Sequence, residues 1–430
     1  MKRWLVLLMG LGLWGVISIV GFYSYLTKNG ARWFSKMTGG SQRDWQRLVR
    51  VLRVYDLPYL VAASFIKTDL PEYELMIDPD DWQFLNTNLP REGLLAEEYR
   101  KFVPATVRIQ RRDYPVKVRY RGDKPEHWLF TKKSWRIIFE NETPPGDVYR
   151  LNLILPEDRG FYSEAISLFV ARRMGLFNLR NEFISLKVNN QPMGAYFMVE
   201  QWSPEVLARN GLDADTNLYG EMSGEQFPDN LYSSSDLFQK YVSYSKLPAS
   251  NKQDLDRLLD YLNNLSDDEF EEKIGQILDI DKFLVWQAHS QLLFNYNSGF
   301  THNANLALNQ DLGKLEFLPW DIAMQSPDEH SIYELNYNPL VERILLNPKW
   351  LCQRDKILLD YVSQPENLTD TLDYIDDLYR KTRWAFYKDQ AKLFLDLGLD
   401  IRYRVLRSWL IKGHGKIRAI TAASVTKCQE

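Results

Sequence analysis

The sequence has little of the residue types that hold metal ions or build disulfide frameworks. Of its 430 residues, two are cysteine and five are histidine. The cysteines, Cys352 and Cys428, lie far apart in the sequence and lack metal-ligand spacing, and the histidines form no HExxH pattern. We therefore expect neither a disulfide framework nor a zinc site.

An excess of positive charge is also missing. The chain has 53 Lys and Arg residues against 57 Asp and Glu, a formal net charge of −4. Nucleic-acid-binding proteins normally carry a basic excess, so we expect no nucleic-acid partner. Apolar residues are abundant, at 45% of the chain. They suffice for the core of one large domain, or of two lobes, with appendages.

A long uncharged run lies near the N-terminus, from Trp4 to Thr27. It is long enough to cross the hydrocarbon core of a membrane as a helix, and no small-x-small cleavage site marks it as a signal peptide. We expect residues 1–27 to form a transmembrane anchor. Basic residues flank the run almost equally on both sides, so the positive-inside rule leaves the topology open.

A basic helix and a linker are expected after the anchor, over residues 28–70. Arginines spaced four, three and three residues apart share one face of this helix: Arg43, Arg47, Arg50 and Arg53. Pro58 is expected to end the helix. The arginine stripe suits contact with anionic lipid headgroups and a solvated helix face equally well.

From Glu72 onward the pattern changes to alternating strands. Two hairpins are expected, in "ATVRIQRRDYPVKVRYRG" with a connection at Arg111 to Tyr114, and in "EFISLKVNNQPMGAYFMVEQ". After about Gly211 the periodicity is mostly helical, interrupted by the two strands "ANLALN" and "KLEFLPWD". A strand-rich N-terminal half joined to a helical C-terminal half predicts an α+β fold of two lobes with a cleft between them.

Several motifs, taken in order, resemble the CotH-like (spore-coat protein H) family of atypical protein kinases. They are "YELMIDPDDW", "VRYRG" followed by "KKSW", "GAYFMVEQ", "HN", "LPWD" and "NPLVERILLNPKW". The resemblance implies a kinase-like two-lobed domain over residues 71–385 that binds ATP and Mg²⁺ or Mn²⁺. Residues 386–430 would then form a C-terminal basic helical extension.

Phosphoryl transfer needs positive charge on the phosphates of the nucleotide. Lys133, Lys132 and Arg121 are the expected cofactor-binding cations. Lys133 shares the apolar face of its strand with Trp135, and we expect that face to point into the cleft. The resemblance implies that Glu200, at the end of "GAYFMVEQ", pairs with the phosphate-binding lysine.

An acid directly after "FLPW", Asp321, is costly to bury unless it is paired or bound to a cation. With the amide oxygen of Asn303, it would hold a magnesium ion on the phosphates. In relatives the preceding loop resembles "NWDGYSHN", with an Asp five residues before the Asn. Here Ser298 stands at that place beside Asn297, and a serine cannot accept the proton of the substrate as a carboxylate does.

These features support three hypotheses about function. The first is a membrane-anchored kinase of the bacterial cell envelope that acts on a protein or glycan, its soluble domain outside the cytoplasm. The second is a pseudokinase or binding module that holds a nucleotide or an envelope partner. The third is a structural protein that binds polysaccharide in an aromatic-rich cleft. Lys133, Glu200, Asn303 and Asp321 favour a nucleotide over a polysaccharide. Ser298 is what separates the first hypothesis from the second.

Overall fold

The computed structural model describes residues 51–90, 94–140, 145–221, 230–295, 303–329, 333 and 338–428. The expected anchor over residues 1–27, and both Asn297 and Ser298, lie outside these residues. Within the part that is described, no helix combines the length and the apolar character needed to cross a membrane.

Seven strands of the N-terminal half close into a barrel in the order β1–β2–β3–β4–β5–β7–β6. Their bounds are β1 Glu72–Met76, β2 Val103–Ile109, β3 Arg112–Tyr120, β4 Trp135–Phe139, β5 Arg150–Ile154, β6 Asn181–Val188 and β7 Gln191–Glu200. Neighbouring strands are antiparallel, except that β1 pairs with β6 in parallel. Alternate residues of β4 are buried in the barrel core, which leaves Arg136 and Ile138 on the outer face.

Both expected hairpins form, and each is closed by a two-residue turn. The turns are Gln110–Arg111 between β2 and β3 and Asn189–Asn190 between β6 and β7. All four residues have positive φ angles, as two-residue hairpin turns of type I′ require. The first turn lies earlier than the expected connection, because Arg112 pairs with Ile109 and already belongs to β3.

Four helices accompany the barrel: α3 Leu57–Ser64, α4 Pro79–Thr87, α5 Ser163–Arg173 and α6 Pro204–Arg209. Asp78 caps α4, since its side chain accepts the N–H of Asp80 at 3.0 Å. The expectation that Pro58 ends a helix was wrong. It lies in the first turn of α3, where a missing N–H costs no hydrogen bond.

A second sheet has the order β11–β10–β8–β9, with bounds β8 Leu218–Glu221, β9 Phe238–Val242, β10 Asn305–Asn309 and β11 Lys314–Leu318. Only β10 and β11 were expected. The strand β8 is buried over three of its four residues and therefore lacks the alternation that marks a strand with one solvated face.

Helices make up most of the remaining C-terminal half. They are α7 Gln253–Asn264, α8 Asp267–Lys273, α9 Ile280–Leu292, α10 Pro339–Leu345 and α11 Pro348–Ser363. Apolar residues of these helices form one core with the second sheet. The expected α+β class, strand-rich in the N-terminal half and helical in the C-terminal half, is confirmed.

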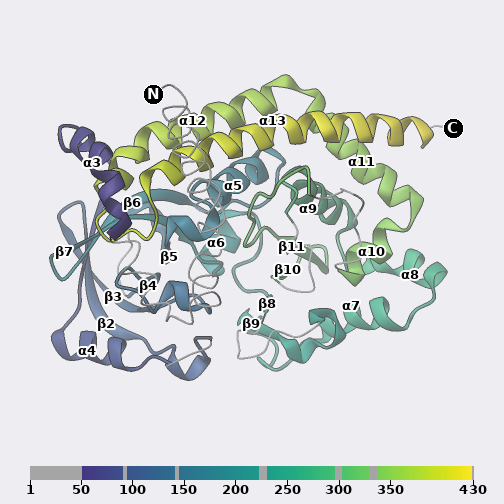
Figure 1. Cartoon of the computed structure of the whole chain (residues 1–430). Coiled ribbons are helices and arrows are strands. Elements are labelled where there is room, and N and C mark those ends of the chain that lie inside the picture. The colour runs from purple at the N-terminus through teal and green to yellow at the C-terminus, as the bar shows by residue number, and fades with distance from the viewer. Residues whose placement is uncertain are drawn as a thin grey trace, which may run out of the picture.

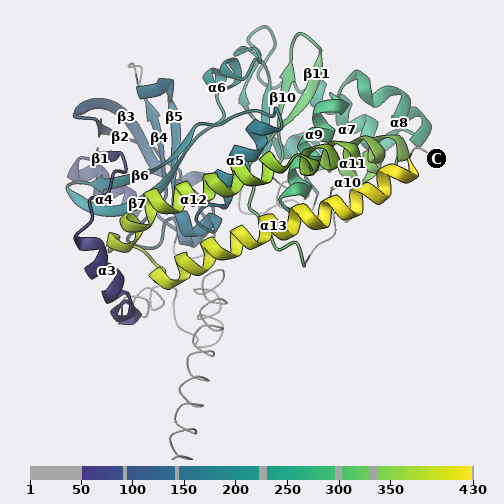
Figure 2. The ribbon, with the colours of Figure 1, turned by 90° about the horizontal axis from the view of Figure 1, so that it is seen from above.

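Two long helices, α12 Pro365–Lys388 and α13 Asp396–Lys427, run beside each other along one side of the molecule and cross both halves (Figures 1 and 2). At 1.5 Å per residue, the 32 residues of α13 extend about 48 Å. The helix buries Leu399, Leu406, Leu410 and Ile417 in the main core. Residues after 385 therefore pack as part of the same body.

A disulfide between Cys352 and Cys428 joins α11 to the residue that follows α13. The sequence reasoning excluded a disulfide framework and did not anticipate this single disulfide. The two cysteines are 76 positions apart in the sequence, but α11 packs against α13 and brings their Cα atoms to 6.1 Å.

Candidate functional site

A cavity of about 260 Å³ lies between the barrel and the second sheet. One wall carries Arg119 on β3, Arg121 directly after β3 and Arg136 on β4. Beside them lies Arg100 with its ion-pair partners Glu97 and Asp123. The facing wall is built largely from the second sheet and includes Glu221, Tyr241, Asn303 and Asn305. The cavity therefore sets a cationic wall opposite polar oxygen-bearing groups.

The pairing of β3 with β4 explains why the arginines gather there. Arg119 and Arg136 are direct cross-strand partners, and Arg121 follows Arg119 by two residues on the same face. Like charges directly opposite each other on a sheet destabilise it. Three guanidinium groups at one strand end therefore indicate a place built for an anion.

Burial lowers the pKa of all three arginines. Burial, together with the nearby Arg100, lowers the pKa of Arg119 to about 10. Burial and Arg159 lower the pKa of Arg121, and burial and Arg119 lower that of Arg136 well below its usual value. Because a guanidinium keeps its proton in proteins, the positive charges remain, at a cost in free energy that an anion would offset.

Two of the arginines also keep N–H donors without a hydrogen-bond partner. Within the described part of the chain, Nε of Arg119 and both Nε and Nη1 of Arg121 are buried and unpaired. Arg136 differs, because it donates to Asn152 Oδ1 at 3.0 Å and to Gln201 Oε1 at 2.7 Å. Arg119 and Arg121 thus line the cavity with guanidinium groups, the groups that recognise phosphate oxygens, and some of their N–H donors are left unsatisfied by protein atoms.

Next to Arg121, a second cluster of charges surrounds Arg159. Its Nε lies 3.2 Å from Asp158 Oδ2 and 3.5 Å from Glu164 Oε2, and its Nη1 pairs with the Asp321 carboxylate. Burial raises the pKa of Glu164, which Arg159 and Arg121 partly counteract. This cluster joins the first turn of α5 to the segment after β11.

Asn303 and Asp321 both adopt positive φ angles, of 57° and 54°. Such a backbone is uncommon outside glycine, Asn and Asp adopt it more readily than other residues, and strained positions of this kind cluster at functional sites. The N–H of Asn303 donates to Glu221 Oε2 at 3.0 Å, and Asn303 lines the cavity. Asp321 follows Trp320, another residue of the cavity wall, but its carboxylate faces Arg159.

The expected phosphate-binding lysines do not line this cavity. Lys133 Nζ donates to the carbonyl oxygens of Trp128 at 2.7 Å and Phe130 at 2.6 Å. The expectation that the apolar face of its strand points into the cleft was wrong, because that face lines the barrel core. Lys132 is fully buried and pairs with Asp389 Oδ2 at 2.5 Å.

Glu200 is not paired with Lys133 either. It accepts the N–H of Arg180 at 2.7 Å and pairs with the Arg209 guanidinium. Burial raises its pKa, and Arg180 and Arg209 act against that rise. The structure thus brings Arg121 and Asn303 to one cavity, with Asp321 beside it, and places the lysines and Glu200 elsewhere.

Arg136 and Glu164 are site residues that the sequence reasoning did not select, whereas Arg119 shares the strand face of the expected Arg121. For Arg136 a signal was available. "VRYRG" and "SWRIIF" each put arginine on the polar face of a strand, and pairing the strands as neighbours would have made those residues meet. For Glu164, buried in the first turn of α5, no sequence signal was available.

Two comparisons with known proteins, by family model and by sequence, point to the same family. The family model described as CotH kinase protein matches residues 118–394, a range that contains Arg119, Arg121, Arg136 and Asp321. Over 263 residues, the chain is 24% identical to the inner spore coat protein H of Bacillus subtilis (strain 168). The matched region covers 59% of this chain and 68% of that protein. The crystal structure of a Helicobacter pylori proinflammatory kinase, CtkA, matches 69% of this chain and 94% of its own at 16% identity. Its TM-score of 0.25 is too low to bear on the fold.

Proposed function

This chain belongs to the CotH kinase protein family, and from that premise we propose that it is an ATP-dependent kinase of the bacterial cell envelope. The reaction is transfer of the terminal phosphoryl group of ATP to a hydroxyl of a protein or glycan, with Mg²⁺ or Mn²⁺. The observation that carries the proposal is the arginine wall of the cavity, in which Arg119 and Arg121 hold buried N–H donors without partners.

The arginines supply the binding of the triphosphate. Arg119 and Arg121 donate their unpaired N–H groups to phosphate oxygens, as charge-assisted hydrogen bonds. Arg136, fixed by Asn152 and Gln201, contributes a positive charge that does not move. Such preorganised charges act strongly because the cavity is partly shielded from water.

The oxygen donors beside the cavity fit a divalent cation. Asp321, Asn303 and Glu221 offer carboxylate and amide oxygens, the ligands that Mg²⁺ prefers. In the described residues, no group of three or more His, Cys, Asp or Glu side chains could hold a metal ion without help, so phosphate oxygens would complete the coordination. Asp321 would exchange Arg159 for the cation, which leaves Arg159 with Asp158 and Glu164. When bound, the cation neutralises negative charge on the phosphates.

A binding module without efficient transfer is the second candidate, and a specific observation favours it. Asp321 already pairs with Arg159, and Ser298 stands where the loop of the resembling relatives has an Asp. On this account the arginine wall still binds the triphosphate, and the hydroxyl acceptor lacks a carboxylate to orient it.

The location in the cell is part of the proposal. Residues 1–27 would anchor the protein as a single-pass membrane protein, and the remaining chain would lie outside the cytoplasm. The Cys352–Cys428 disulfide supports this side of the membrane, because disulfides persist mainly in oxidising compartments. No nucleic acid is expected as a partner.

Titration of the full chain in detergent tests the proposal. ATP with Mg²⁺ or Mn²⁺ should raise the thermal transition, Arg121→Met should abolish most of the rise, and Arg112→Met should not. Arg112 is a matched control because it is exposed on the same strand and outside the cavity. Measuring transfer of the labelled phosphoryl group from ATP to components of envelope extracts then distinguishes a kinase from a binding module. The absence of any ATP-induced shift would refute both.

A further inference from the structure

The helix α3 carries no charged residue and is nevertheless only half covered. Its sequence is LPYLVAAS, and one side packs against the domain through Ala63, which is buried in the main core. On the same side the Tyr59 ring lies 5.0 Å from the Tyr387 ring of α12. A helix that is apolar all round normally has all of its faces covered, by protein or by lipid.

The opposite side of α3 and of the turns before it is exposed. Six large apolar side chains there have exposed fractions between 52% and 86%: Val51, Val54, Tyr55, Leu57, Val61 and Phe65. In the described chain nine other large apolar side chains are exposed, scattered over it, and of these only Leu312 and Leu346 reach 52%. A concentration of this kind marks an interaction surface. We call these six residues the α3 apolar face.

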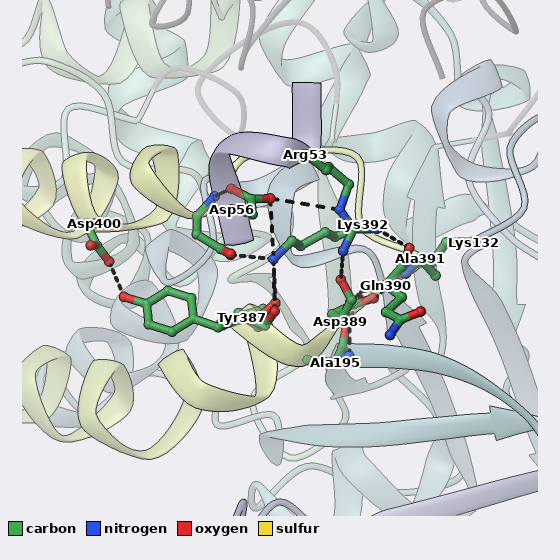
Figure 3. A network of polar contacts seen from close by, with 12 residues as sticks. Arg53, Asp56, Lys132, Ala195, Tyr387, Asp389, Gln390, Ala391, Lys392 and Asp400 are labelled. Carbon is green, nitrogen blue, oxygen red and sulfur yellow. Dashed lines mark hydrogen bonds and ion pairs between the residues drawn. The ribbon is translucent and has the colours of Figure 1, made fainter. Parts of the chain in front are cut away.

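The α3 apolar face is fixed to the domain by buried polar contacts, shown in Figure 3. Asp56 accepts the N–H of Asp396 at 2.9 Å and lies 3.8 Å from Lys392 Nζ. Arg53 Nη2 donates to the carbonyl oxygen of Asp389 at 3.0 Å. The side chain of Asp389 in turn pairs with Lys132, so the contacts reach from α3 to the barrel (Figure 3). The face is therefore a built surface of the domain.

Charge decides which partner suits this face. Arg53 and Asp56 are the only charged residues between Val51 and Ile66, and both turn inward to the contacts just described. The outer side thus offers no acid to repel an anionic surface and no ion pair for a protein partner. Arg43, Arg47 and Arg50 lie directly before it in the sequence, and the uncharged run ends at Thr27.

We propose that the α3 apolar face is a second membrane contact, which inserts at the boundary between lipid headgroups and acyl chains. Apolar and aromatic side chains with arginines beside them in the chain are the chemistry that such interfaces accept. The contact is independent of the chemistry in the cavity.

The contact also orients the domain on its membrane. Figure 1 shows α3 at one corner of the molecule, beside the ends of α12 and α13 and away from β8 and β9. Residues of β8 and β9, Glu221 and Tyr241, line the cavity. With α3 on the lipid, the cavity stays open to an acceptor from the aqueous side.

Site-specific fluorescence on the full chain tests this contact. Val54→Cys and Val61→Cys would be labelled with the environment-sensitive dye NBD, since Cys352 and Cys428 are held in their disulfide. Leu312→Cys is the matched control, because Leu312 is 54% exposed and lies in the turn between β10 and β11. The protein is reconstituted in vesicles of phosphatidylcholine and phosphatidylglycerol.

At positions 54 and 61 we expect nitroxide-labelled lipid to quench the NBD fluorescence and aqueous iodide to lose its quenching effect. At position 312 we expect iodide to quench the fluorescence and the labelled lipid not to. Iodide quenching at 54 and 61 equal to that at 312 would overturn the proposal. Protection from iodide without quenching by the labelled lipid would also overturn it, because the cover would then be protein, either residues 1–50 or a second copy. ATP titration of the same vesicles reports on the cavity separately.

Discussion

Replacing Arg119 by methionine should stabilise the ligand-free protein while it weakens ATP binding. Methionine keeps an apolar stem and removes the guanidinium. Burial, with Arg100 nearby, lowers the pKa of Arg119 from 12.5 to about 10. At about 1.4 kcal/mol per unit, the folded state carries about 3 kcal/mol of unfavourable charge below that pH, which the substitution removes.

Part of this gain is offset by lost contacts. Arg119 Nη1 donates to the Tyr120 carbonyl oxygen at 3.1 Å, worth about 1 kcal/mol, and its guanidinium lies 5.2 Å from the centre of the Phe102 ring, worth about 0.5–1 kcal/mol. The free energy of unfolding should therefore rise by about 1 kcal/mol. Loss of charge-assisted bonds to phosphate, about 1.5–3 kcal/mol, should raise the Kd for ATP roughly tenfold to a hundredfold.

Urea unfolding and calorimetric titration measure the two quantities, with Arg112→Met as the control on the same strand. The experiment looks for a rise in the free energy of unfolding together with a loss of ATP affinity. Replacing an arginine with a purely structural role would lower the free energy of unfolding and leave the affinity unchanged. A lower unfolding free energy together with an unchanged Kd would refute the assignment of Arg119 to ligand binding.

Three further predictions follow from single residues. Ser298→Asp should raise phosphoryl transfer about a hundredfold by restoring a group that orients the acceptor, and no gain despite intact ATP binding would favour the binding module. Asp321→Asn should remove the Mg²⁺-dependent part of ATP affinity and leave the ligand-free thermal transition standing, whereas collapse of that transition would mark a structural role. Burial raises the pKa of Asp396 to about 7, so the folded state binds an extra proton between about pH 4 and 7. Stability should fall as pH rises through that window, and equal slopes for wild type and Asp396→Asn would exclude Asp396 as the cause.

Local features of the fold could be predicted from the sequence, because local chemistry determines them. Alternation marked the barrel strands, and Asn189–Asn190 sits at the turn where positive φ angles are needed. Asp78, directly before Pro79, caps α4, as the sequence Asp-Pro-Asp favours. The buried strand β8 was not predicted, because a strand covered on both faces shows no alternation of apolar and polar residues.

The site was harder to predict, since it depends on which face of a strand meets which neighbour. Alternation separates Lys133 from Arg136 on opposite faces, but it does not tell whether the apolar face lines a barrel core or a cleft. Here the barrel takes the apolar face, and Arg136 rather than Lys133 reaches the cavity. The pairing of Asp321 with Arg159 joins segments that are remote in sequence, and no local pattern encodes it.

The central claim is that the arginine wall binds the phosphates of a nucleotide. Calorimetric titration of the wild-type full chain with ATP and with adenosine, each in the presence of Mg²⁺, tests it most directly, because the two ligands differ only in the triphosphate. The account predicts that ATP binds and that adenosine binds far more weakly or without measurable heat. Equal affinities for the two ligands, or no binding of ATP, would contradict it.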